Sequence, residues 1–245
     1  MKGPFDDRRR PASRLIVLSG LDGSGKSTQT ALLAERLRSE GIPAEVVWNR
    51  WKPMVSALFI AFAKHCLRAR RGVQADDYRG FTDAKRHTMR SGWKRCLWQI
   101  MVWTEYAAQV RSRLIIHQLK GVSILCDRYV YDTLIDIAIN FSVSADELEL
   151  LMNHPLLALF PRPGVVIFID IDPETGAARK ADGTPSAYLA DRRPYYARLA
   201  RMLKAPVVDG GQSVESVERS IRDLTLDWRA SRAAERSVRT RGTMQ

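Results

Sequence analysis

The sequence predicts an α/β fold in which helices cover both faces of a five-stranded parallel sheet. Short apolar runs recur along the chain, segments with helical periodicity separate them, and a glycine-rich loop directly follows the first run. This alternation favours a parallel sheet, because each connection must cross one face of the sheet before the next strand can pair. A chain of 245 residues suits one domain of this class.

Five runs rich in Val, Ile and Leu are the candidate strands, at residues 14–19, 44–48, 122–126, 164–171 and 206–208. Helices are expected at residues 26–40, 54–67, 95–119, 144–159 and 213–228. Ser144 and Glu147 have the spacing of a capping box at the start of one of them. A further helix should begin at Asp172 and Pro173, which suit its N-cap and first turn. Residues 68–94 lose periodicity and are expected to be loop or short helix.

The composition is that of a folded, basic protein, with 45% hydrophobic residues and a formal charge of +12. The surplus of Lys and Arg is concentrated in residues 1–14, 64–95 and 229–245. Such segments can attract nucleic acid, anionic membrane or anionic substrate, and the two tails are expected to be solvated basic surface. No nucleic-acid-binding motif accompanies these segments, so a nucleic-acid partner is not expected. The sequence has no apolar signal core, no membrane-length apolar run and no CxxC pair, so a cytoplasmic protein without a membrane span is expected.

The strongest motif is a phosphate-binding loop, G-x-x-x-x-G-K-[ST], at residues 20–27. Its glycines let backbone N–H groups turn inward around phosphate oxygens, and the helix that follows directs its positive end at the same anion. Lys26 should reach the β- and γ-phosphates of ATP, and Ser27 should ligate Mg²⁺. The ATP-binding residues expected from this motif are Gly20, Asp22, Gly23, Ser24, Gly25, Lys26, Ser27 and Thr28.

Four segments, GLDGSGKSTQ, CDRY, FIDIDPE and VVDGGQSVESV, follow one another in this order. Over residues 14–50 and 95–228 they resemble the thymidylate kinase family of P-loop nucleoside monophosphate kinases. The resemblance implies a three-layer P-loop kinase fold and transfer of the γ-phosphate of ATP to dTMP with Mg²⁺, giving dTDP and ADP. Nucleotide substrates and a homodimer are the expected partners.

The resemblance also implies a domain organisation. A P-loop kinase domain would cover residues 14–228, between a basic N-terminal tail at 1–13 and a basic C-terminal tail at 229–245. Residues 51–94 have no clear counterpart in the family and form a divergent segment expected on the acceptor side.

Several side chains take roles from the family pattern. Asp127, at the end of a buried strand, resembles the acid near Mg²⁺ and the transferred phosphoryl group, and with Ser27 completes the expected metal set. Arg128 resembles the arginine that holds the acceptor phosphate, for which a guanidinium fork is suited. Asp22 and Arg50 are further expected contacts of the acceptor. On spacing alone, Asp22 could equally stabilise a turn, and Asp127 and Arg128 could form a structural ion pair.

Residues 179–193 resemble the lid over ATP. The phosphate loop has Gly23 where some relatives carry a basic residue, and in relatives with a plain loop the lid arginines supply charge to the transition state. Arg192 and Arg193 are therefore expected to be catalytic together with Lys26, Asp127 and Arg128, and Arg179 is expected to bind ATP. A solvated helix face is the alternative interpretation of these arginines. Residues 209–213 resemble the loop that cups adenine.

The residues that read the base depart from the family. Tyr106 stands where the family has a base-reading arginine, Asp132 replaces a serine, and Ile-Asp-Ile at 135–137 replaces Ala-Tyr-Gln. Tyr106 and Asp132 are the expected acceptor contacts at these positions, although Tyr106 also fits a core-packed series with Trp93, Trp98 and Trp103. Three functions stay open: a thymidylate-like kinase, a kinase of the same fold with another phosphorylated or sugar-like acceptor, or a non-catalytic nucleotide-binding module.

Overall fold

The computed structural model describes residues 14–52, 54, 57, 92–140, 142–180 and 182–242. Its five strands form one parallel sheet in the order β2-β3-β1-β4-β5. Their bounds are β1 Leu15–Gly20, β2 Ala44–Trp48, β3 Ser123–Asp127, β4 Val165–Asp170 and β5 Val207–Asp209. The predicted α/β class, the five strands and their parallel arrangement are confirmed.

Helices connect the strands within the described part of the chain. Their bounds are α1 Lys26–Ser39, α4 Gly92–Leu119, α5 Val130–Asn140, α6 Leu148–Met152, the 3₁₀ helix η1 Pro155–Leu159, α7 Pro173–Arg179, α8 Ser186–Leu203 and α9 Val214–Gly242. The helix predicted at 54–67 and the loop predicted at 68–94 lie almost entirely outside the described residues. None of the described helices is both long enough and apolar enough to cross a membrane.

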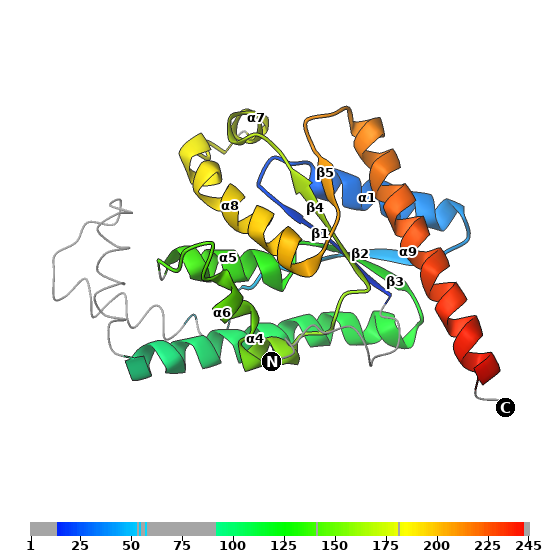
Figure 1. Ribbon diagram of the computed structural model, residues 1–245, viewed down its shortest axis with the longest axis horizontal. Coiled ribbons are helices and arrows are strands. Elements are labelled where there is room, and N and C mark those ends of the chain that lie inside the picture. Colours follow the sequence, from blue (N-terminus) through cyan, green and yellow to red (C-terminus); the bar gives the residue numbers. More distant parts are fainter. Residues whose placement is uncertain are drawn as a thin grey trace.

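Alternate side chains of the strands enter two separate cores, which makes three layers. On β1, Leu15 and Val17 pack with α4, α5 and α8, whereas Ile16 and Leu18 pack with α1 and α9. Figure 1 shows α1 and α9 together on one side of the sheet, with α5 and α8 on the other. All six residues of β1 are buried, as expected for a central strand covered on both faces.

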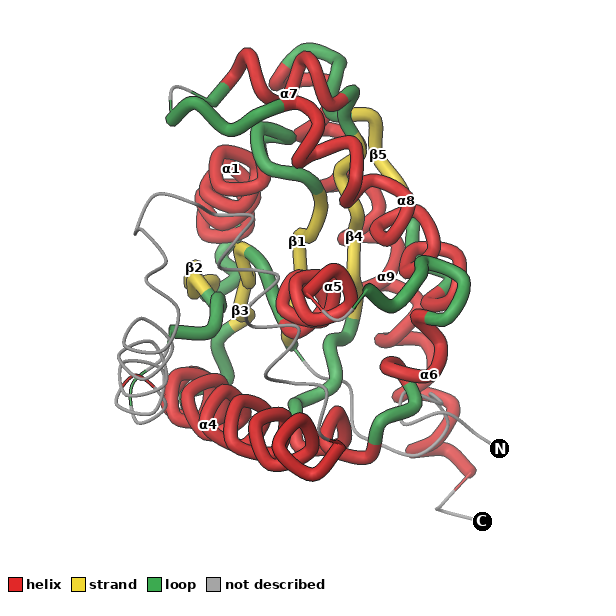
Figure 2. Tube along the Cα trace, turned by 90° about the vertical axis from the view of Figure 1, so that its left-hand side faces the viewer, coloured by secondary structure: helices red, strands yellow, loops and turns green. Residues whose placement is uncertain are grey.

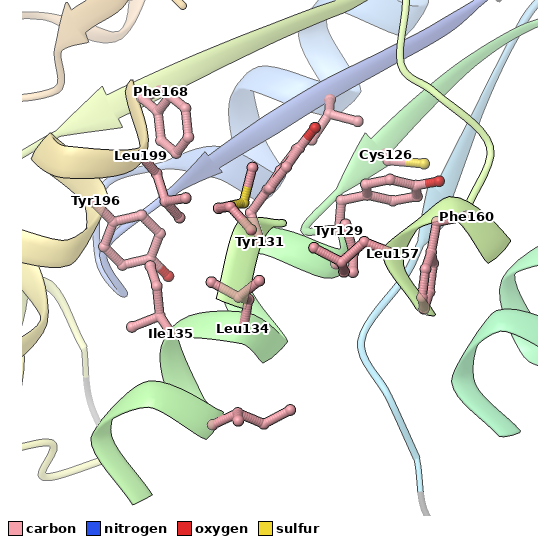
Figure 3. Packing of buried hydrophobic residues seen from close by; sticks show 14 of the residues in the cluster. Cys126, Tyr129, Tyr131, Leu134, Ile135, Leu157, Phe160, Phe168, Tyr196 and Leu199 are labelled. Carbon is pink, nitrogen blue, oxygen red and sulfur yellow. The ribbon is translucent and has the colours of Figure 1, made fainter. Parts of the chain in front are cut away.

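Aromatic side chains fill the core under α5 (Figure 3). Tyr129 and Tyr131, at the start of α5, make edge contacts with each other, and Tyr129 also meets Phe160. Phe168 of β4 bridges Tyr131 and Tyr196 of α8. These contacts fix α5 and α8 against the carboxyl ends of β3 and β4, where the functional side chains lie.

The helix predictions differ from the structure at several points. The helix predicted at 144–159 is wrong: the Ser144–Glu147 contacts do form, but α6 starts only at Leu148 and the chain turns into η1 at Pro155. Proline has no backbone N–H and holds His154 in an extended conformation, so one helix cannot continue through it. Helix α5 was not foreseen, and α9 continues past residue 228 to Gly242 through a stretch rich in Ala and Arg.

The topology brings two loops to the same edge of the sheet. Leu18 of β1 pairs with Asp127 of β3, so the loop after β1 and the turn after β3 emerge side by side. The connection after β1 runs to β2 on one side of the sheet and the connection after β3 runs to β4 on the other, which is where open α/β sheets bind ligands. Figure 2 shows α7 over the edge from which the β1–α1 loop emerges.

Candidate active site

The phosphate-binding loop has the backbone that its glycines allow. Gly25 is the N-cap of α1 with φ 87°, and Gly23 has φ 81°, both in the left-handed region. A Cβ atom on Gly23 would lie 2.1 Å from the carbonyl oxygen of Gly176 in α7. The contact between these two glycines explains why this loop has no basic side chain at position 23: α7 occupies the space.

Lys26 is buried at the start of α1, with an exposed fraction of 5%. Its Nζ donates to the carbonyl oxygen of Leu21 at 2.5 Å and to Ser24 Oγ at 3.5 Å, so it closes the loop on itself. Burial, together with repulsion from Arg128, lowers its pKa to about 8, although nearby carboxylates act in the opposite direction. A bound phosphate would supply the counter-charge that this ammonium group needs.

Ser27, the last residue of the phosphate-binding loop, contacts Asp127 at the end of β3. The Ser27 hydroxyl donates to Asp127 Oδ2 at 2.5 Å. The other carboxylate oxygen, Oδ1, is buried and has no hydrogen-bond partner among the described residues. The Ser27 hydroxyl and the Asp127 carboxylate are in contact, and Asp127 Oδ1 can still accept. Oxygen atoms of this kind are the ligands that a small divalent cation prefers.

Arg128 is clamped between two carboxylates. It donates to Asp22 on the phosphate loop through one nitrogen and to Asp132 Oδ1 at 3.4 Å through another. Arg128 has φ 70°, an uncommon conformation for a residue with a side chain, at the turn between β3 and α5. Burial alone would raise the pKa of Asp22, but Arg128, Lys26 and Lys180 outweigh it and lower that pKa to about 2. Both partners of the clamp are therefore charged at neutral pH.

Asp132 is a buried anchor with an exposed fraction of 4%. It accepts hydrogen bonds from Ser19 Oγ at 3.0 Å, from the backbone N–H of Tyr129 at 3.1 Å and from the Tyr196 hydroxyl at 2.8 Å, in addition to Arg128. Four donors leave this carboxylate little capacity for a ligand. In this structure its contacts are those of a residue that positions Arg128.

A second carboxylate, Asp136, lies one helical turn further along α5. Its two oxygens face two arginines, Arg192 of α8 at 3.2 Å and Arg50, which follows β2, at 3.5 Å. The Arg192 guanidinium also stacks over the ring of Tyr188, with Cζ 3.4 Å from the ring centroid. The small pocket at this point is lined by Asp22, Arg50, Arg128, Asp132, Asp136, Tyr188, Arg192 and Tyr196.

The larger cavity, of about 470 Å³, lies over the phosphate loop and is of a size usual for a ligand. It is lined by the loop from Asp22 to Thr28 and by Arg128, Arg179, Lys180, Gly210 and Gln212, with Gln29, Val214 and Val217. Arg179 donates to the Gly210 carbonyl oxygen at 2.8 Å, which ties α7 to the loop after β5. The expected loop residues other than Gly20, together with Arg179 and part of the 209–213 segment, thus surround one cavity.

Two expected site residues lie elsewhere. Tyr106 is fully buried in the core: its ring packs on Phe160, and its hydroxyl donates to the Asn49 carbonyl oxygen at 2.7 Å. It therefore has no surface to offer a ligand in this structure, and its core-packing interpretation fits. Arg193 points away from Arg192 and pairs with Asp170 at 2.7 Å, because neighbouring residues on a helix lie about 100° apart.

Sequence reasoning missed several residues that line these pockets. Tyr188 and Tyr196 lie four residues before and after Arg192, so all three share one face of α8, and this spacing could have identified them. Ser19 lines neither pocket, but it donates to Asp132, and it gave no such signal because Asp132 is 113 residues away along the chain.

The chain is similar to proteins named thymidylate kinase from several organisms. One from Francisella philomiragia is 25% identical over 85% of this chain and 96% of its own length. One from Arabidopsis thaliana is 27% identical over 89% of this chain and 73% of its own length. One from Schizosaccharomyces pombe is 30% identical over 68% of this chain and 65% of its own length. No family model matches the chain. The similarity to these proteins over most of the chain, together with the parallel five-stranded sheet and its phosphate loop, supports a thymidylate kinase-like family and a nucleotide kinase function.

Proposed function

We propose that the enzyme transfers the γ-phosphate of ATP to a nucleoside monophosphate, with a thymidylate-like nucleotide as the leading acceptor. One observation carries this proposal: the phosphate-loop cavity and the arginine-lined pocket share Asp22 and Arg128 as lining residues. A donor phosphate over the loop and an acceptor phosphate held by arginines would then be neighbours. Phosphoryl transfer depends mainly on such positioning and on stabilisation of the developing charge.

Different residues have different roles in the proposed reaction. Backbone N–H groups of the loop and Lys26 hold the β- and γ-phosphates, and Arg179 borders the same cavity. Arg128, fixed by Asp22 and Asp132, orients the acceptor phosphate for in-line attack. Arg192, on the face of α8 toward the pocket, contacts the acceptor phosphate and stabilises charge on the group that is transferred to it. Arg193, paired with Asp170 outside this pocket, is left out of this assignment.

We propose Mg²⁺ as the metal ion, with Ser27 and Asp127 as its protein ligands. When bound, this ion would neutralise charge on the donor phosphates. Among the described residues, no cluster of three or more His, Cys, Asp or Glu could hold a metal by itself. Two protein oxygens completed by substrate phosphates and water suit Mg²⁺, which dehydrates reluctantly.

A kinase with another acceptor is the second candidate, and a specific observation favours it. Asp136 brings a carboxylate into the acceptor-side pocket, and Tyr106 is buried where the family pattern places a base-reading arginine. Loss of hydrogen-bonding donors to a base costs a large part of the discrimination between substrates. Recognition of thymine through such donors therefore lacks support in this chain.

The test is kcat/KM for dTMP, measured by steady ADP release against dUMP, dCMP, dGMP, other monophosphates and phosphosugars. A value for dTMP near about 10⁵ M⁻¹s⁻¹, well above every competitor, would establish the thymidylate acceptor. A higher value for another monophosphate would establish the second candidate. No turnover with any acceptor, with tight ATP binding retained, would contradict the proposed reaction.

We also propose that the enzyme is a homodimer. Helix α4 exposes large apolar side chains near both of its ends, and exposed apolar surface favours a protein contact. They are Leu97, Ile100, Ile115, Ile116 and Leu119. Sedimentation of the purified full chain at micromolar concentration tests this, with a monomer as the contradicting result.

A further inference from the structure

The acceptor-side pocket is filled by its own ion pairs. Three arginines and three aspartates from several elements line it, together with two tyrosines, and the free space between them is only about 10 Å³. That volume is close to the smallest cavity that holds a single water molecule, whereas pockets for small ligands measure hundreds of Å³. An acceptor can enter only if some of these side chains part.

The three carboxylates are held with different strength. Asp132 is buried and has four donors, and Asp22 forms a partly buried ion pair with Arg128. The side chain of Asp136 keeps 33% of its surface exposed, and its ion pairs of 3.2 and 3.5 Å are longer than close charge-assisted hydrogen bonds. Solvent screens such pairs, so Asp136 is the carboxylate of this pocket that is easiest to displace.

The two arginines that hold Asp136 come from opposite sides of the pocket. Arg50 follows β2, and Arg192 belongs to α8, the helix that enters the predicted lid. Each donates to a different oxygen of the same carboxylate. Two guanidinium groups converging on one anion form the arrangement that would bind the oxygens of a phosphate monoester.

We propose that Asp136 is a stand-in anion: in the absence of acceptor it occupies the phosphate subsite formed by Arg50 and Arg192, and the acceptor phosphate must displace it. The proposal rests on the proposed function for the identity of the acceptor. A phosphate monoester with two negative charges and three free oxygens competes well with one carboxylate, while an uncharged nucleoside cannot. Asp136 thus selects phosphorylated acceptors, and their entry breaks the ion pair that joins Asp136 to Arg192 of α8.

The first experiment measures inorganic phosphate binding to the full-length enzyme with ADP bound, so that the phosphate loop is occupied. Removal of a competing anion raises the population of the open subsite, so Asp136→Asn should lower the Kd for phosphate about three- to tenfold. Asp136→Glu, which keeps the charge, should stay close to the wild type. Asp223→Asn is the matched control, because it removes the carboxylate of an exposed Arg–Asp pair on α9, remote in sequence from the pocket.

The second experiment measures turnover with the preferred monophosphate. Asp136→Asn should lower the acceptor KM about three- to tenfold and leave the KM for ATP unchanged, which separates competition at the subsite from a general change in the charge of the site. Asp136→Asn should not make the corresponding nucleoside an acceptor.

Two results would overturn the proposal. A higher phosphate Kd and a higher acceptor KM in Asp136→Asn would mean that Asp136 contacts the acceptor directly. Unchanged phosphate Kd would mean that its ion pairs are ordinary surface pairs. Absence of turnover with every monophosphate would contradict the proposed function, and the phosphate titration would still decide the role of Asp136.

Discussion

Lys26 is deeply buried, and its pKa is lowered to about 8, so its charge changes close to neutral pH. The sequence motif predicted its role, but only the fold shows that burial, more than any neighbour, makes its charge costly. Binding of a triphosphate stabilises the ammonium form and therefore takes up a proton when the pH lies above about 8.

We predict that ATP affinity falls as the pH rises through this range. Lys26 loses its proton above pH 8 in the free enzyme, and neutral Lys26 offers the phosphates little attraction. The Kd for ATP should rise about five- to tenfold between pH 7.5 and pH 9. Equilibrium titration at constant ionic strength measures this. The Lys26→Ala variant should bind weakly at both pH values, and an equal pH dependence in that variant would assign the effect to another group.

Asp132 shows the limit of reading single residues from a motif. Its position predicted a contact to the acceptor, whereas the fold surrounds it with Ser19, Tyr129, Arg128 and Tyr196. Two of these partners lie 113 and 64 residues away in sequence, and no local pattern encodes such distances.

At the scale of elements, the phosphate loop and α7 are packed as one unit. Gly23 and Gly176 allow their backbones to meet, and Arg179 and Lys180 at the end of α7 reach Gly210 and Asp22. The periodicity of the sequence located the strands of this unit well, because a buried parallel strand is a continuous apolar run. It did not identify α5, because periodicity alone cannot assign a short, mainly apolar segment to a helix or a strand.

A pair of glycine variants tests the packing of this unit. Ala at position 23 or 25 must adopt a positive φ, which costs about 1–2 kcal/mol, but only at position 23 does the new Cβ also meet the backbone of α7. We predict that Gly23→Ala lowers the melting temperature more than Gly25→Ala. It should also increase hydrogen exchange over residues 173–180. Equal effects of the two variants would contradict the close contact.

The lid predicted at residues 179–193 runs from the end of α7 into α8. Its ion pairs, Lys180 with Asp182 and Arg192 with Asp136, are partly exposed and easily rearranged. We predict that ATP analogue plus acceptor slows hydrogen exchange over residues 179–193, whereas α9 is unaffected. Unchanged protection of residues 179–193 with both ligands bound would contradict a lid.

For the whole molecule, the sequence predicted the parallel sheet and the phosphate loop because local signals specify both. Strand order and the meeting of Asp22, Arg128 and Asp132 depend on long-range pairing and could not be read from any one segment. Arg192 and Arg193 are adjacent in sequence but pair with different aspartates, and only the packing of α8 determines which. The acceptor pocket is therefore the part of the site that the sequence described least well.

The most direct test of the central claim follows the transferred group itself. The full-length enzyme is incubated with magnesium and ATP that carries a radioactive γ-phosphate, with each nucleoside monophosphate in turn. We predict that the label appears in the nucleoside diphosphate of at least one acceptor, and that Lys26→Ala lowers this rate at least about a hundredfold whereas Lys120→Ala, on the exposed surface, does not. Label found only as inorganic phosphate, or near-normal transfer by folded Lys26→Ala, would contradict the account.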